Sequence, residues 1–84
     1  MKEQIARTPS QIGAAVRRFR RDLKLSQTVL GQRTSLRQAT ISALENGEPG
    51  TELRTLIDVL TALELELVIR PRTKASASTI EDIF

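Results

Sequence analysis

Gln38 begins a short segment whose apolar residues have helical spacing. Its amide is the side chain in this sequence best suited to binding a ligand by hydrogen bonds. Ile41 and Leu44 lie three residues apart, which predicts the inward seam of a short helix, and Asn46-Gly47 predicts its end. The outward residues are small, amide or basic: Arg37, Gln38, Ala39, Ser42 and Ala43. Such a face fits the major groove of DNA, where glutamine can pair bidentately with adenine. The segment therefore indicates recognition of bases by hydrogen bonding.

A second short helix is expected directly before this one, so that residues 25–47 form two helices joined by a tight turn. Ser26 is a suitable N-cap because its hydroxyl can accept a hydrogen bond from a free backbone N–H, and Leu30 is the inward residue. Gly31 is unusual within a helix, where glycine costs about 1 kcal/mol relative to alanine. We therefore expect another helix to cross closely at Gly31. Thr34-Ser35 interrupts the pattern and marks the turn.

These residues resemble the helix-turn-helix of the Xre/lambda-repressor-like family. The resemblance rests on LSQxxLG at residues 25–31 and ATISALENG at residues 39–47, and it extends from about Ile12 to Leu65. Three positions depart from the family pattern: Gly31 replaces the usual alanine, Thr34 an aliphatic residue and Ser35 a glycine. The alternative interpretation is an ordinary helical hairpin within a bundle.

The resemblance implies that the second helix enters the major groove while the first is braced against the DNA backbone. The implied base-contacting residues are Arg37, Gln38, Ala39 and Ser42. The implied phosphate-contacting residues are Gln27, Arg33 and Thr40, the first of them supported by helix N-terminal N–H groups. Glu45 and Asn46 also match the motif, and for these two we expect a structural role in fixing the helix ends.

The composition excludes several other classes of protein. The 84 residues include no cysteine and no histidine, which removes disulfides, the usual zinc ligand sets and the commonest general base. No acid–base or nucleophile constellation stands out, so we expect neither an enzyme nor a metal or small-molecule cofactor. No apolar run approaches the roughly 18 residues of a membrane span, and no signal peptide is recognisable. We expect a soluble bacterial protein of the cytoplasm, associated with the nucleoid.

The net charge of +3 conceals an uneven distribution. Residues 1–37 contain nine Lys or Arg and two acidic residues, whereas residues 38–84 contain four Lys or Arg and eight acidic residues. A basic half suggests an electrostatic footprint for nucleic acid. The candidates for phosphate contacts in the first helix are Arg17, Arg20, Arg21 and Lys24, and we assign Arg17 and Arg21 to the DNA interface. The alternative is that these side chains only keep the helix solvated.

We expect a mainly α fold, a lambda-repressor-like bundle of four to five short helices at residues 9–63, preceded by a polar arm at residues 1–8. Thr8-Pro9 predicts the first helix start, with Gln11 completing a capping box. The inward stripe of this helix is Ile12, Ala15, Val16, Phe19 and Leu23. A loop at residues 48–50 precedes Thr51, the expected cap of the last helix. The core stripe expected there is Leu53, Leu56, Ile57, Leu60 and Leu63.

The period changes after the bundle. Residues 64–71 alternate between polar and apolar types and predict a β-strand that stops at Pro71. The chain has no second alternating segment, so we expect this strand to pair with its copy in a homodimer, through Leu65, Leu67 and Ile69. Residues 72–84 have the composition of a disordered tail. Its last residues suggest a partner-docking motif of Ile80, Ile83 and Phe84, and the alternative is a tail without a role.

Within the family, three features resemble HipB-type antitoxins: QATIS at residues 38–42, LxALELEL at residues 60–67 and the strand–tail extension. This resemblance implies a homodimeric repressor that binds a palindromic double-stranded operator and holds a HipA-type Ser/Thr kinase toxin. A stand-alone Xre-type transcriptional regulator is an alternative, which a neighbouring kinase gene would argue against. A protein-interaction adaptor on the same scaffold is a third interpretation, disfavoured by the basic first helix and by the Gln27/Gln38 pair.

Overall fold

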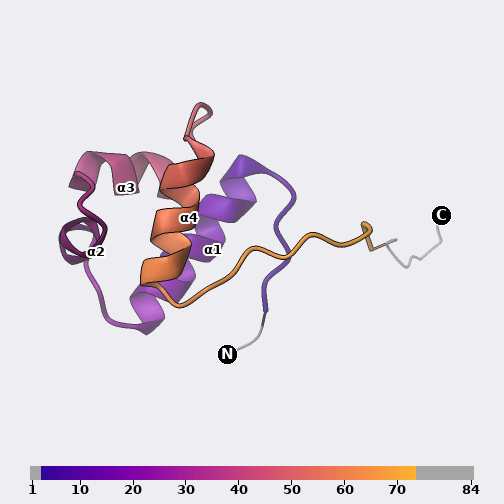
Figure 1. The fold of residues 1–84 in the computed structure, drawn as a ribbon, viewed down its shortest axis with the longest axis horizontal. Coiled ribbons are helices and arrows are strands. Elements are labelled where there is room, and N and C mark those ends of the chain that lie inside the picture. The colour runs from indigo at the N-terminus through magenta and orange to yellow at the C-terminus, as the bar shows by residue number, and fades with distance from the viewer. Residues whose placement is uncertain (1–2, 74–84) are drawn as a thin grey trace.

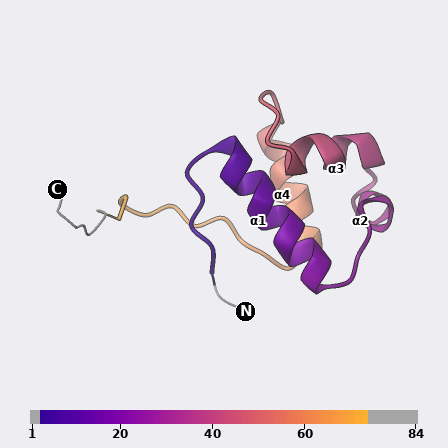
Figure 2. The same cartoon turned by 180° about the vertical axis from the view of Figure 1, so that it is seen from behind.

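The computed structural model describes residues 3–73 and contains four α-helices in that range. Figure 1 shows α1 (Pro9–Asp22), α2 (Gln27–Thr34), α3 (Gln38–Glu45) and α4 (Leu53–Ala62). α1 and α4 cover opposite sides of the bundle, and α2 and α3 lie together at one end (Figures 1 and 2). The mainly α bundle that the sequence predicts is confirmed. None of the described helices is long and apolar enough to cross a membrane.

One cluster of aliphatic side chains holds the helices together. Its buried members come from all four helices and from the residue after α4: Val16, Leu30, Ile41, Leu44, Val59 and Leu63. Ile12, Phe19, Leu56 and Leu60 pack against this cluster while partly buried. Full burial of one such aliphatic side chain contributes roughly 1.5–3 kcal/mol, so this cluster is the main source of stability.

The core stripe expected on α4 is partly wrong. Leu53 and Ile57 are 67% and 39% exposed, whereas Val59, which is not part of the predicted stripe, is fully buried. Residues four apart share one side of a helix, so the buried side runs through Val59 and Leu63 while Leu53 and Ile57 lie on another side. Leu23, expected in the stripe of α1, is 47% exposed because it follows the last residue of that helix.

The helix starts follow the expected capping chemistry at two of three places. The Thr8 hydroxyl accepts a hydrogen bond from the Gln11 N–H at 3.1 Å, and the Ser26 hydroxyl accepts one from the Val29 N–H at 3.0 Å. The Gln11 side chain reaches back to the N–H of Arg7, one residue before the cap. The cap expected at Thr51 is wrong. Glu52 occupies that position without a side-chain cap, and the Thr51 hydroxyl donates to the Glu48 carbonyl instead.

Two glycines mark close approaches of backbone to backbone. A Cβ atom at Gly13 would lie 2.5 Å from the carbonyl oxygens of Leu44 and Glu45, so this glycine allows α1 to lie against the end of α3. A Cβ atom at Gly31 would lie 2.6 Å from the carbonyl oxygen of Leu36. The close neighbour expected at Gly31 is therefore the turn before α3 and not a crossing helix.

Residues 64–71, expected as a strand, form no strand within the described part of the chain. Figure 1 shows this segment leaving the end of α4 and passing beside the N-terminal segment. Leu65 packs against the core, whereas Leu67, Val68 and Ile69 are exposed. A strand is defined by pairing and only one copy of the chain is present, so the intersubunit sheet stays a prediction. The docking motif expected at residues 80–84 lies outside the described residues.

Candidate nucleic-acid interface

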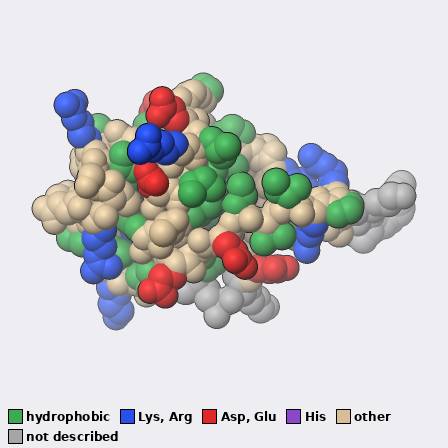
Figure 3. Space-filling view, viewed as in Figure 1, with side chains coloured by type: hydrophobic (Ala, Val, Ile, Leu, Met, Phe, Trp, Pro, Cys, Tyr) green, Lys and Arg blue, Asp and Glu red, His purple; other side chains and the backbone are tan. Residues whose placement is uncertain are grey.

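The outer face of α3 agrees only in part with the sequence prediction, because Ser42 and Ala43, expected on it, are half-buried. The residues that lead this helix are exposed: Arg37, Gln38 and Ala39. Thr40 and Ser42 are half-buried, and Ile41 and Leu44 point into the core. Lys and Arg side chains project from the same end of the molecule, where α2 and α3 lie (Figure 3). The face therefore offers hydrogen-bonding and basic groups without a large apolar side chain.

The turn between α2 and α3 depends on Ser35. This residue has φ 59° in the left-handed region, which glycine adopts at the lowest cost. The N–H of Leu36 then donates to the carbonyl of Gly31 at 2.9 Å and closes the end of α2. Serine thus takes up the turn conformation at the position where the family usually has glycine.

A buried carboxylate joins three helices beneath this face. The Glu45 side chain of α3 is 0% exposed and forms a bidentate ion pair with Arg20 of α1, with Nε–Oε2 at 2.5 Å and Nη2–Oε1 at 2.9 Å. Gln27 of α2 donates from Nε2 to Oε1 of the same carboxylate at 3.0 Å. Glu45 therefore has the structural role expected of it, although it connects α1, α2 and α3 and does more than fix a helix end.

The environment keeps this pair ionised. Burial alone would raise the pKa of Glu45, but the hydrogen bonds from Arg20, Gln27 and Arg17 and the positive charge of Arg20 together outweigh burial, and the pKa is lowered from its usual value. The hydrogen bond with Glu45 likewise raises the pKa of Arg20. At neutral pH the carboxylate is consequently an acceptor only, and it can offer no proton to its neighbours.

Arg20, one of the four candidates for phosphate contacts, is not available for them. Its side chain is 9% exposed, and beyond the ion pair its Nη1 donates to the Leu25 carbonyl at 2.7 Å. Gly13, Val16 and Arg20 recur at spacings of three and four residues, which places Arg20 on the buried side of α1. The signal in the sequence was this spacing together with an acidic residue on α3 that can neutralise the charge.

The residues expected to read bases and to bind phosphate meet at the start of α2 and α3. Gln38 Nε2 donates to Gln27 Oε1 at 2.6 Å. Each glutamine is the first residue of its helix, so the hydrogen bond ties the two helix N-termini together. Two positions eleven residues apart in sequence thus form one unit at the surface.

The remaining basic candidates for phosphate contacts differ in their exposure and in their contacts with other side chains. Arg17 is 42% exposed in its side chain and lies 3.5 Å from both Glu45 Oε1 and Asn46 Oδ1, at the edge of the buried pair. Arg21 and Arg33 are exposed. Contact of Arg17, Arg21 and Arg33 with DNA stays a prediction.

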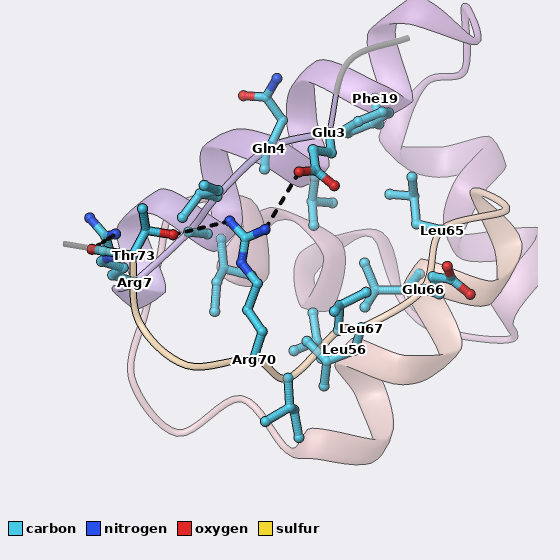
Figure 4. A pocket seen from close by; sticks show the side chains of 18 of the residues that line it. Glu3, Gln4, Arg7, Phe19, Leu56, Leu65, Glu66, Leu67, Arg70 and Thr73 are labelled. Atoms are coloured by element: carbon cyan, nitrogen blue, oxygen red, sulfur yellow. Dashed lines mark hydrogen bonds and ion pairs between the residues drawn. The ribbon is translucent and has the colours of Figure 1, made fainter. Parts of the chain in front are cut away.

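A second feature lies away from this face, between α1, α4 and the segment after α4. It is a groove with a volume of about 730 Å³ whose apolar lining includes Phe19, Leu56, Leu65 and Leu67. Figure 4 shows these side chains and the contacts that close one end of the groove. There Arg70 lies 3.7 Å from Glu3, and Arg7 donates to the Thr73 carbonyl at 3.1 Å. The N-terminal arm is therefore held beside the C-terminal segment.

Comparison with known sequences agrees with this architecture. The model of a helix-turn-helix domain family matches residues 11–73. Antitoxin HipB of Escherichia coli is 31% identical over 74 residues, which cover 88% of this chain and 84% of that protein. An uncharacterized HTH-type transcriptional regulator of Sinorhizobium fredii is 44% identical over 59 residues, which cover 68% of this chain and 29% of that protein.

Solved structures give the same result. A complex of HipB with an O4 20mer superposes with a TM-score of 0.79 at 30% identity, covering 84% of this chain and 100% of that one. A HipA-HipB-O2-O3 complex contains a chain with a TM-score of 0.78, also at 30% identity and with the same coverage. These matches show that the chain belongs to the Xre/lambda-repressor-like helix-turn-helix family and, within it, to the HipB-type antitoxins.

Proposed function

We propose that this protein represses transcription by binding a palindromic operator as a homodimer and that it holds a HipA-type Ser/Thr kinase toxin. The observation that carries the proposal is the exposed start of α3, where Gln38 is hydrogen-bonded to Gln27 at 2.6 Å. A helix-turn-helix places such residues against base edges in the major groove. Similar proteins have been solved bound to O4 and O2 sequences, which supports DNA as the partner.

Dimerisation is proposed through residues 64–70. Leu67, Val68 and Ile69 are 51%, 66% and 92% exposed, next to an apolar groove. Exposed apolar surface of this kind marks interaction sites, and a second copy of the chain would remove it from water. Two antiparallel copies centred on Val68 would place Glu66 opposite Arg70, a favourable pairing of charges. The two-fold axis would set two α3 helices about one DNA turn apart, roughly 34–36 Å.

Sedimentation tests this arrangement. Leu67→Pro removes a backbone donor from the ribbon together with an apolar anchor, so it should yield monomers with reduced affinity for operator DNA. Leu67→Ala keeps the N–H and serves as the matched variant, which should dimerise more weakly than the unmodified chain but more strongly than Leu67→Pro. A Leu67→Pro protein that sediments as a dimer would move the interface to another surface.

The kinase partner is supported by the HipA-HipB-O2-O3 complex and by the coverage of antitoxin HipB along most of its length. Affinity purification from the native cell, followed by mass spectrometry, tests it directly. A HipA-type Ser/Thr kinase should co-purify, and deletion of residues 73–84 should weaken its retention if Ile80, Ile83 and Phe84 form the docking motif. The truncated chain should still fold and bind DNA.

A second candidate function is a stand-alone transcriptional regulator without a toxin. The similarity to the uncharacterized HTH-type transcriptional regulator of Sinorhizobium fredii, at 44% identity over 59 residues, supports transcriptional regulation, which both candidates share. Purification of the chain alone, with operator binding intact, would support this candidate over the antitoxin.

A further inference from the structure

We propose that Glu45, which lies beneath the DNA-binding face, fixes the direction of the Gln38 amide and thereby favours adenine over guanine at the contacted base. Glu45 is a positioning residue, because it acts through Gln27 and does not itself reach the surface. The inference rests on the proposed recognition of DNA by α3 and adds to it a residue that determines specificity.

The first step is the polarity of the buried hydrogen bonds. The Glu45 carboxylate accepts from Arg20 and, at 3.0 Å, from Nε2 of Gln27. Because an ionised carboxylate offers acceptors only, the nitrogen of the Gln27 amide must face inward and its oxygen outward. The opposite orientation would bring two acceptor oxygens together in a buried site, which is unfavourable.

The second step carries this polarity to the surface. The outward Oε1 of Gln27 accepts from Nε2 of Gln38 at 2.6 Å. An amide has two N–H donors and one carbonyl acceptor, so Gln38 keeps one N–H and its Oε1 for a ligand. Gln38 is exposed and leads α3, so these two groups are available to a base edge.

The third step is complementarity to the base. Adenine presents one acceptor, N7, and one donor, the N6 amino group, in the major groove, which matches one N–H and one carbonyl oxygen. Guanine presents two acceptors, N7 and O6, and would place O6 against the Gln38 oxygen. If the Gln27 amide were reversed, Gln38 would turn its oxygen inward and present two N–H donors, which suits guanine. We call Glu45, Gln27 and Gln38, with the hydrogen bonds that join them, the relay. The Glu45 carboxylate at its buried end thus selects between the two purines.

The test uses a variant that removes the Glu45 carboxylate and leaves Gln27 and Gln38 in place. Arg20→Met/Glu45→Leu replaces the whole buried ion pair by apolar side chains, an exchange that is often neutral for folding, whereas removal of one partner is not. Arg18→Gln/Glu48→Gln is the control, because it also removes one positive and one negative charge, at exposed positions outside the relay.

The first measurement needs no DNA. In protein labelled with ¹⁵N-glutamine, the Gln38 side-chain amide should resonate away from the position of a solvated glutamine in the unmodified chain and in the control. It should shift in Arg20→Met/Glu45→Leu, because the Gln27 amide can then adopt both orientations, although Gln38 is unchanged and is hydrogen-bonded to neither substituted residue. An unmoved Gln38 resonance in that folded variant would overturn the relay.

The second measurement uses a duplex selected by the unmodified protein from a randomised 20-bp pool. Replacing the contacted adenine by guanine should weaken binding about tenfold or more per half-site for the unmodified chain and the control. The ratio of the affinity for the adenine duplex to the affinity for the guanine duplex should fall toward one in Arg20→Met/Glu45→Leu. A retained preference would overturn the inference alone, whereas failure of the unmodified chain to select any sequence would overturn the proposed function as well.

A third variant covers the case in which the double variant does not fold. Gln27→Met leaves the Arg20–Glu45 pair intact and interrupts the relay one step later. It should shift the Gln38 resonance and reduce the preference for adenine. Loss of a phosphate contact from Gln27 would weaken binding to both duplexes equally, since phosphate contacts carry no base information. An unchanged ratio in this variant would contradict the proposal.

Discussion

Arg20 and Glu45 form a bidentate ion pair between α1 and α3 in which the acidic side chain is 0% exposed and the basic one 9% exposed. The Gly13 contact with the end of α3 makes this approach possible, since a Cβ atom there would meet the Leu44 and Glu45 carbonyls at 2.5 Å. The pair lies directly beneath Gln27, so the stability of the bundle and the order of its DNA-binding face depend on the same carboxylate.

Removal of one partner should be costly. Glu45→Ala leaves the Arg20 guanidinium buried without its counter-charge, and we expect a loss of about 3–5 kcal/mol in the free energy of unfolding. Urea denaturation followed by circular dichroism measures this loss. Glu48→Ala, at an exposed position, is the control and should change stability by less than about 0.5 kcal/mol. A Glu45→Ala protein as stable as this control would contradict the ion-pair geometry.

Stability should also fall in acid because of Glu45. The folded state lowers the pKa of this carboxyl group, so the unfolded chain takes up the proton at a higher pH than the folded chain. The contribution is fully present above the unfolded value of about 4.3 and is lost as the pH decreases further, through the lower folded value. Urea denaturation at a series of pH values should show this decline, and Arg20→Met/Glu45→Leu should show less of it. Equal slopes in the two proteins would assign the acid sensitivity to other carboxylates.

Gly31→Ala should destabilise this chain even though alanine is the better helix former. The added methyl group would lie 2.6 Å from the Leu36 carbonyl oxygen, so the turn before α3 must move. We expect a loss of about 1–3 kcal/mol, typical of overpacking, in place of the gain of about 1 kcal/mol from helix propensity. Gln32→Ala, exposed on the same helix, is the matched control. Thermal unfolding that shows Gly31→Ala to be the more stable of the two would disprove the close contact.

The basic residues should differ in their effect on the salt dependence of DNA binding. Each Lys or Arg that neutralises a phosphate adds about 0.9 to the slope of log K against log salt. Arg17→Gln and Arg21→Gln should each lower the slope by about this amount per half-site if both contact the backbone. Arg18→Gln, exposed on the same helix, is the comparison. A slope that Arg17→Gln leaves unchanged would assign Arg17 to the edge of the Glu45 network.

Much of the fold was predictable because local signals agree with tertiary packing. Thr8 and Ser26 cap the helices that they were expected to cap, and Ile41 and Leu44 are buried as their spacing indicates. Arg20 stood among the candidates for phosphate contacts because helical spacing alone does not distinguish a charged residue at the surface from one that is paired in the core. The partner that decides the matter lies 25 residues away, on α3.

The candidate site was predicted by residue type, but its connections were not. The sequence indicates separate helices and separate partners for Gln27 and Gln38, and only the packing of α2 against α3 brings the two amides within 2.6 Å. For the segment at residues 64–70 the sequence predicts a strand, but its pairing is not seen in a single chain. Its alternating pattern is clear in the sequence, yet the partner that would make it a strand is expected from a second chain.

Recognition of bases by Gln38 underlies the proposed function, and a single substitution tests it. Gln38→Ala should weaken binding to the duplex selected by the unmodified protein by about 1–3 kcal/mol per half-site, because it removes a bidentate base contact. Binding of the same variant to a random duplex at the same salt concentration should change little, since phosphate contacts dominate there. Equal weakening on both duplexes would show that Gln38 does not read bases and would contradict the account.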